Sequence, residues 1–277
     1  MRIGELLRTM REEAATRRLN PRDADLLLSD VLQKPAAWLI AHDDEEVSAE
    51  DEDAYTDLLA RRFRGEPLQY IRGRCEFYGR EFLTDRRALI PRPETEHLVE
   101  SAVSLIPRNG RVIDVGTGSG CISVSVALER PDLTVYATDI SIEALLVARS
   151  NRDRLGASVE LFVADSVRGF QGPFDAILSN PPYIPAKEIP YLQSEVREHE
   201  PRVALTTGGE GLDVVRELVD SAPSLLTPEG RLFMEIGYQQ RDAVQALASD
   251  RGWGSIRFVD DLAAIPRMAL LEGVPRD

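Results

Sequence analysis

Cysteine, histidine and long apolar runs are scarce in this sequence, and each scarcity excludes a class of protein. The two cysteines, Cys75 and Cys121, are far apart and form no CxxC pair, and with only three histidines we expect no metal site. No apolar run reaches the roughly 20 residues that a membrane-spanning helix requires. The N-terminal stretch MRIGELLRTMREEAATRR is interrupted by polar residues and helical in period, unlike a secretory signal. These features predict a cytoplasmic protein with no membrane contact.

Basic residues are outnumbered by acidic ones, 33 to 47, which gives a formal net charge of −14. Eight carboxylates and no base lie between Asp43 and Asp53. Such a run is most often a solvated loop or the start of a helix, and it repels phosphate backbones. The sequence therefore predicts no direct contact with nucleic acid.

The N-terminal part of the chain has a purely helical pattern. Apolar residues recur at helical spacing within 3–10 and 24–32, and Ser48 is placed to cap a third helix over 48–64. Around Gly79 the pattern changes to an apolar–polar alternation that predicts a β-hairpin. We therefore expect a small all-α domain over residues 1–68, a hairpin linker over 69–90 and a larger α/β domain over 91–277.

From Arg111 onward, predicted strands and helices alternate. This alternation is typical of a Rossmann-like, mostly parallel seven-stranded sheet covered on both faces, here with one antiparallel pairing at the end. Ligands of such sheets bind at the carboxyl ends of the strands. The expected strands are RVIDVG, TVYAT, SVELFVA, FDAILSN, RLFMEIG, SIRFVD and RMALLEG, and the expected helices span 119–130, 141–155, 210–226 and 238–250.

A glycine-rich turn, DVGTGSGC (114–121), follows the first of these strands. Alone it indicates no more than tight strand–helix packing. Two acids at the ends of the next strands accompany it: Asp139 can accept hydrogen bonds from ribose hydroxyls, and Asp165 is placed to approach the base of the same nucleoside. The arrangement resembles the S-adenosylmethionine site of Rossmann-like methyltransferases, whose donor has no phosphates. Accordingly, no basic residue occurs in 112–128.

The tetrapeptide Asn180-Pro181-Pro182-Tyr183 follows the fourth strand and resembles the NPPY motif of methyltransferases that act on planar nitrogens. An amide nitrogen is a poor nucleophile because its lone pair is delocalised. The side-chain carbonyl of Asn180 and the main-chain carbonyl of Pro181 can accept both N–H bonds of an amide and orient it. Tyr183 can pack its ring against the amide plane, and the prolines keep the turn stiff. The expected catalytic residues are Asn180, Pro181 and Tyr183.

The likeness extends over nearly the whole chain. The segments PLQYI (67–71), LIPRPETE (89–96), SNPPYI (179–184), EPRVAL (200–205), GGEGLD (208–213) and EIGYQQ (235–240) resemble the glutamine N5-methyltransferases of peptide chain release factors, the PrmC/HemK family. This resemblance implies methylation of the glutamine in the GGQ motif of class 1 peptide chain release factors. Because all donor motifs start after Arg111, we expect the domain over 1–68 to dock that substrate, and we expect a monomer. The resemblance also implies S-adenosylmethionine binding by Gly116, Thr117, Gly118, Ser119, Gly120, Asp139, Asp165, Ser166 and Asn180, and glutamine binding by Asn180, Pro181, Pro182 and Tyr183.

Two positions depart from the family pattern. Ser166 and Val167 stand where the family often has an aromatic residue against the adenine. Near the C-terminus, DLAAIPR (261–267) carries Ala264 where the family has glycine, so we expect an altered turn there without loss of function.

Three other functions compete with this interpretation. A ribosomal-protein glutamine methyltransferase shares NPPY, but LIPRPETE favours the release-factor enzymes. A DNA adenine methyltransferase also uses NPPY, but the acidity and the lack of a basic stripe speak against it. A non-catalytic binding protein would be expected to have lost Asn180 or a glycine of the turn, and all are present.

Overall fold

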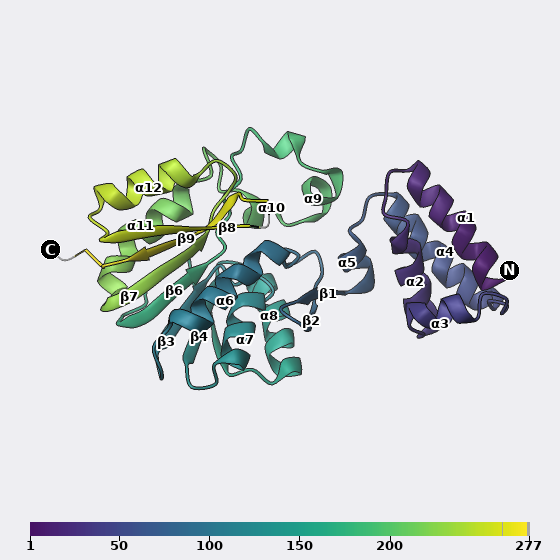
Figure 1. Cartoon of the computed structure of the whole chain (residues 1–277), viewed down its shortest axis with the longest axis horizontal. Helices are drawn as coiled ribbons and strands as arrows, with labels where there is room; N and C mark the ends of the chain where they lie inside the picture. The colour runs from purple at the N-terminus through teal and green to yellow at the C-terminus, as the bar shows by residue number, and fades with distance from the viewer. Residues whose placement is uncertain (262, 276–277) are drawn as a thin grey trace. The chain divides into compact units, whose positions relative to one another are not determined.

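The computed structural model describes residues 1–261 and 263–275 (Figure 1). The chain divides into two compact units: residues 1–73 together with 194–199, and residues 74–193 together with 200–277. None of the described helices is long and apolar enough to cross a membrane.

The first unit is entirely helical, and its helices pack around Leu27, Leu28 and Tyr55, which are fully buried. The expected cap is present, because Ser48 Oγ accepts a hydrogen bond from the main-chain N–H of Asp51 at 3.1 Å. Three short helices of this unit were not predicted: α3 (Ala36–Ala41), α5 (Leu68–Arg72) and α9 (Ser194–His199). The helices of this unit are α1 (Ile3–Thr16), α2 (Arg22–Leu32), α3 (Ala36–Ala41), α4 (Ala49–Phe63), α5 (Leu68–Arg72) and α9 (Ser194–His199).

The predicted hairpin, β1 (Arg74–Phe77) and β2 (Arg80–Leu83), belongs to the second unit. Phe77 and Phe82 are buried in the core of that unit. The side chain of Asn151 holds both the main-chain N–H and the carbonyl of Leu83, at 2.7 and 2.9 Å. The hairpin is therefore packed into the α/β unit through apolar burial and a two-point hydrogen bond.

Seven strands form the main sheet in the order β5-β4-β3-β6-β7-β9-β8. The expectation of one antiparallel pairing was wrong, since β9 runs antiparallel to both of its neighbours, β7 and β8. Because β9 is inserted between two strands that share a direction, a single reversed strand produces two antiparallel pairs. The strands are β3 (Arg111–Val115), β4 (Thr134–Asp139), β5 (Val159–Val163), β6 (Phe174–Ser179), β7 (Leu226–Glu235), β8 (Ser255–Asp260) and β9 (Pro266–Glu272).

Helices cover both faces of the sheet, as the alternation predicted (Figure 1). In β3, Val112 packs with α6 and α7 on one face, whereas Ile113 packs with α11 and α12 on the other. The helical elements of this unit are η1 (Pro93–Thr95), α6 (Glu96–Leu105), α7 (Cys121–Glu129), α8 (Ile142–Leu155), η2 (Ile189–Tyr191), α10 (Arg202–Leu205), α11 (Asp213–Leu225) and α12 (Arg241–Asp250).

The turn before β9 places Ala264 at φ 59°, in the left-handed region that favours glycine. The turn is closed by hydrogen bonds from Asp261 N to Ile265 O at 2.8 Å and from Ala264 N to Asp261 O at 2.9 Å. Ala264, which stands where the family that the sequence resembles has glycine, thus occupies a glycine-type conformation.

Candidate active site

The glycine turn links β3 to α7 and lies at the carboxyl edge of the sheet. Gly116, Gly118 and Gly120 have φ values of 74°, 57° and 81°, which side-chain-bearing residues rarely adopt. At Gly120 a Cβ atom would also come within 3.2 Å of Ala148 Cβ on α8. The main-chain N–H groups of Gly116 and Thr117 are anchored on Thr138 O, at 2.9 and 2.8 Å. The sequence therefore specifies a fixed, open turn at this edge.

Asp139 is bound to the glycine turn. Its Oδ2 accepts from the main-chain N–H of Gly118 at 2.9 Å, and its Oδ1 accepts from that of Ser141 at 2.8 Å. Burial raises the pKa of Asp139, and these main-chain donors oppose the rise. Each carboxylate oxygen has more than one lone pair, so both can also accept from a ligand.

Asp114, at the end of β3, was not singled out from the sequence. It is fully buried, and its Oδ2 accepts from Thr117 Oγ1 at 2.6 Å and from Ser123 N at 3.2 Å. Burial raises the pKa of Asp114 to about 6. Asp114 thus connects the glycine turn to the first turn of α7. Its role could have been inferred from its position in the sequence, two residues before Gly116.

Asp165 and Ser166 follow β5 and line the same cavity as Asp139. The Asp165 carboxylate forms an ion pair with Arg168 at 2.7 Å. Ser166 adopts φ 58°, and its Oγ is buried without a hydrogen-bond partner among the described residues. A buried hydroxyl of this kind beside a cavity is suited to a polar ligand, because an unsatisfied buried polar group is costly.

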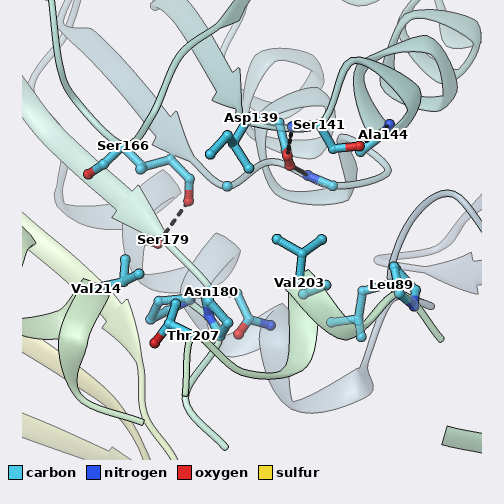
Figure 2. A pocket seen from close by; sticks show the side chains of 18 of the residues that line it. Leu89, Asp139, Ser141, Ala144, Ser166, Ser179, Asn180, Val203, Thr207 and Val214 are labelled. Carbon is cyan, nitrogen blue, oxygen red and sulfur yellow. Dashed lines mark hydrogen bonds between the residues drawn. The ribbon is translucent and has the colours of Figure 1, made fainter. Parts of the chain in front are cut away.

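The segment from Asn180 to Pro182 follows β6 and lines the cavity, which has a volume of about 190 Å³. Figure 2 shows Asp139 and Asn180 on opposite sides of this space. Asn180, Pro181 and Pro182 line it together with Gly116 and Gly118, whereas Thr117 and Ser119 line a smaller adjoining hollow that Asn180 also borders. Gly120 and Tyr183 are not among the lining residues of either space.

Tyr183 is held by its own main chain and by its hydroxyl. Tyr183 O accepts from Gln240 Nε2 at 2.9 Å, and a Cβ atom on Gly211 would come within 2.2 Å of that carbonyl. The Tyr183 hydroxyl donates to Glu235 Oε1 at 3.0 Å. Burial and the neighbouring Glu235 raise the pKa of Tyr183, so the phenol stays protonated. Tyr183 therefore fixes the loop from behind the cavity wall.

Thr95 and Glu235 complete the site, and sequence reasoning did not assign a role to either. Asn180 Nδ2 donates to Thr95 Oγ1 at 3.1 Å, and Thr95 Oγ1 donates to Glu235 Oε2 at 2.5 Å. Glu96 Oε1, one residue after Thr95, accepts from the main-chain N–H of Tyr78 at 2.8 Å. The sequence did contain one indication of a role for Glu235. It is the last residue of β7, so it lies at the same edge of the sheet as Asp139.

Both parts of the chain match models of known protein families. The PrmC N-terminal domain model matches residues 5–73, and the methyltransferase small domain model matches residues 94–249. Release factor glutamine methyltransferase of Koribacter versatilis is 43% identical, with 89% of each chain covered. The enzyme of the same name from Neisseria gonorrhoeae is 42% identical, over 90% of this chain and 92% of the relative.

A solved methyltransferase structure from Pyrococcus furiosus aligns with a TM-score of 0.55 at 18% identity, over 72% of this chain and 91% of that chain. This likeness shows the fold alone.

Proposed function

This chain belongs to the release factor glutamine methyltransferase family, and we propose that it methylates the glutamine of the GGQ motif in class 1 peptide chain release factors. The methyl group comes from S-adenosylmethionine and is transferred to the side-chain amide nitrogen, N5. Family membership confirms the resemblance inferred from the motifs and favours it over the DNA adenine methyltransferase and the non-catalytic binding protein.

One observation carries the proposal for the site: a single cavity is lined by Gly116, Gly118 and Asp139, here called the first wall, and by Asn180, Pro181 and Pro182, the second wall. Asp139 and Asn180 lie on opposite sides of it (Figure 2). A donor held by the first wall and an amide held by the second would meet in that space. Holding two reactants at contact distance removes much of the entropic part of the barrier.

The first wall fits the donor, S-adenosylmethionine, which supplies an electrophilic methyl group when bound. The turn at Gly116 and Gly118 lets a ligand approach the main chain closely, because nothing lies within 4 Å of the space where a Cβ would be. Asp139 presents two carboxylate oxygens for ribose hydroxyls, and Ser166 offers its buried hydroxyl. Thr117 and Ser119 border the adjoining hollow, which suits the polar tail of the ligand.

The second wall holds the substrate amide. Asn180 donates its Nδ2 hydrogen to Thr95, and within the described part of the chain no donor reaches its Oδ1. This oxygen and the main-chain carbonyl of Pro181 accept the two N–H bonds of the glutamine amide. Both acceptors stabilise the positive charge that develops on the nitrogen as its lone pair attacks, after which the nitrogen loses one proton. Tyr183 contributes by fixing the loop, since its hydroxyl points to Glu235.

The helical unit of residues 1–73 supplies the docking surface for the protein substrate in this proposal. The enzyme acts as a monomer in the cytoplasm, where release factors work, and it contacts no nucleic acid. Support for the last point is the net charge of −14, which opposes a phosphate backbone.

The test is mass spectrometry of purified release factor after incubation with the enzyme and S-adenosylmethionine. We expect a mass increase of one methyl substitution, confined to the peptide that carries GGQ, and a strongly slowed increase with Asn180→Ala at unchanged melting temperature. Glutamine methylation of ribosomal proteins in the same assay, with none on the release factor, would instead support the ribosomal alternative.

A further inference from the structure

A hydrogen-bonded chain connects Asn180 to a buried carboxylate and returns to the same loop at Tyr183. Asn180 Nδ2 and Thr95 Oγ1 are 3.1 Å apart, and Thr95 Oγ1 and Glu235 Oε2 are 2.5 Å apart. The Tyr183 hydroxyl donates to the other carboxylate oxygen, Glu235 Oε1, at 3.0 Å, which brings the chain of hydrogen bonds back to the loop that carries Asn180. Its members come from the turn that precedes α6, from the end of β7 and from the loop after β6. Two segments that are distant in the sequence thus contact Glu235 at the end of β7.

The donor directions in this chain depend on one another. A threonine hydroxyl has a single hydrogen to donate, and Thr95 gives it to the carboxylate of Glu235. Thr95 can therefore only accept from Asn180, which turns the Asn180 N–H₂ group toward Thr95. The carbonyl oxygen Oδ1 is then the part of Asn180 left for the substrate amide. If Glu235 lost its negative charge it could donate to Thr95, and Thr95 could donate to Asn180 Oδ1 instead.

Glu235 is 3% exposed and Thr95 is 2% exposed, so water does not compete for these bonds. The charged and titratable groups around the carboxylate are Tyr183 from the loop, Glu94 from η1, Arg267 from β9 and Cys121 from α7. The pKa of Glu235 is raised overall, chiefly by burial, although the hydrogen bonds from Thr95 and Tyr183 and the charge of Arg267 oppose the rise. The two hydroxyl donors are partners that an ionised carboxylate requires in such surroundings.

We propose that Glu235 and Thr95 are positioning residues for the methyl transfer, which hold Asn180 with its carbonyl oxygen turned toward the substrate amide. This inference rests on the proposed role of Asn180 as the acceptor of the glutamine N–H. The negative charge of Glu235 is passed on by polarisation through the Thr95 hydroxyl and the Asn180 amide. Asn180 Oδ1 is thereby a stronger acceptor at the moment when positive charge develops on the attacking nitrogen.

The test compares Thr95→Val with Thr95→Ser, because valine keeps the shape of threonine without its hydroxyl and serine keeps the hydroxyl. We expect Thr95→Val to lower kcat on release factor by about 10- to 100-fold, by analogy with the loss of hydrogen bonds that orient the ligands of metal sites. Thr95→Ser should stay within about 3-fold of the wild type on the same principle. Because Thr95 also borders the smaller hollow assigned to the polar tail of the donor, kcat is compared at saturating S-adenosylmethionine, and calorimetry gives the donor affinity of each variant.

The pH profile of kcat provides a second measurement, which does not depend on how well the valine variant folds. The wild type and Thr95→Ser should lose activity at the acid end as Glu235 takes up a proton, and Glu235→Gln should lack this acid limb. A valine variant as active as the serine variant, or an acid limb that persists in Glu235→Gln, would overturn the positioning role. A wild-type enzyme without activity on release factor would instead refute the proposed function.

Discussion

The carboxylate of Asp139 accepts a hydrogen bond from the main-chain N–H of Gly118 at 2.9 Å, so the acid at the end of β4 and the glycine turn after β3 form one unit. Replacing Asp139 by alanine should therefore weaken S-adenosylmethionine binding in two ways. A charged acceptor for ribose hydroxyls is lost, and the turn loses its partner at Gly118. We expect a loss of about 1.5–3 kcal/mol in calorimetric titration.

The matched control for that change is Asp132→Ala, because Asp132 pairs with Arg130 just before β4, at the opposite end of this strand. It should leave donor affinity unaltered. An Asp139→Ala enzyme that binds the donor as tightly as the control would remove Asp139 from the site.

Asn180→Ala should leave donor affinity nearly unchanged and reduce turnover by about 10²–10³, as for the loss of one preorganised polar group at a reacting centre. Asn180→Asp separates two accounts of this residue. If acceptance alone mattered, aspartate would retain more activity than alanine. The contact with Thr95 reverses that expectation, because a carboxylate cannot donate to Thr95 and adds a second negative charge near Glu235.

We therefore expect Asn180→Asp to be no more active than Asn180→Ala in single-turnover assays with release factor. Substantial activity of the aspartate variant at normal melting temperature would show that the N–H₂ group of Asn180 is dispensable.

A fragment that begins at Arg74 should bind S-adenosylmethionine but methylate intact release factor poorly, because it lacks helices α1 to α5. A fragment that begins at Leu89 is the wrong choice, since it omits Phe77 and Phe82, both buried in the core of the α/β unit. Losing two such side chains costs several kcal/mol. Full activity of a stably folded 74–277 fragment would refute the docking role of the helical unit.

The pKa of Asp114, raised to about 6 by burial from the model-compound value of 3.8, makes stability depend on pH. The folded protein keeps a proton on Asp114 that the unfolded chain releases near pH 4. Stability from this group is thus present below pH 4 and is lost as the pH rises through about 6, by roughly 2–3 kcal/mol. Urea unfolding of Asp114→Asn across this range should lack that decline, and an identical pH dependence in both proteins would contradict the assignment.

Ala264→Gly should stabilise the protein by about 0.5–1 kcal/mol. Relief of the left-handed conformation at φ 59° outweighs the additional chain entropy that glycine gives the unfolded state. Ala263→Gly is the control, because Ala263 is not among the residues with positive φ and should gain nothing. Thermal unfolding of both variants gives the comparison, and equal melting temperatures would argue against strain at Ala264.

Elements that depend on local pattern could be predicted from the amino-acid sequence. The alternation from Arg111 onward specified a parallel sheet with helices on both faces, and strand-end positions placed Asp139 and Asn180 at one edge, because the carboxyl ends of parallel strands lie together. Ser48 was recognisable as a cap because capping involves residues only three apart.

Only the tertiary structure decided the partners that are distant in the chain. Thr95 and Glu235 are 140 positions apart, and no periodicity or spacing relates them. The same holds for the insertion of β9 between β7 and β8, which depends on how the last strands pack rather than on their own pattern. The Tyr183 hydroxyl turns to Glu235 because a buried carboxylate needs donors, and only the folded chain determines which donors are within reach.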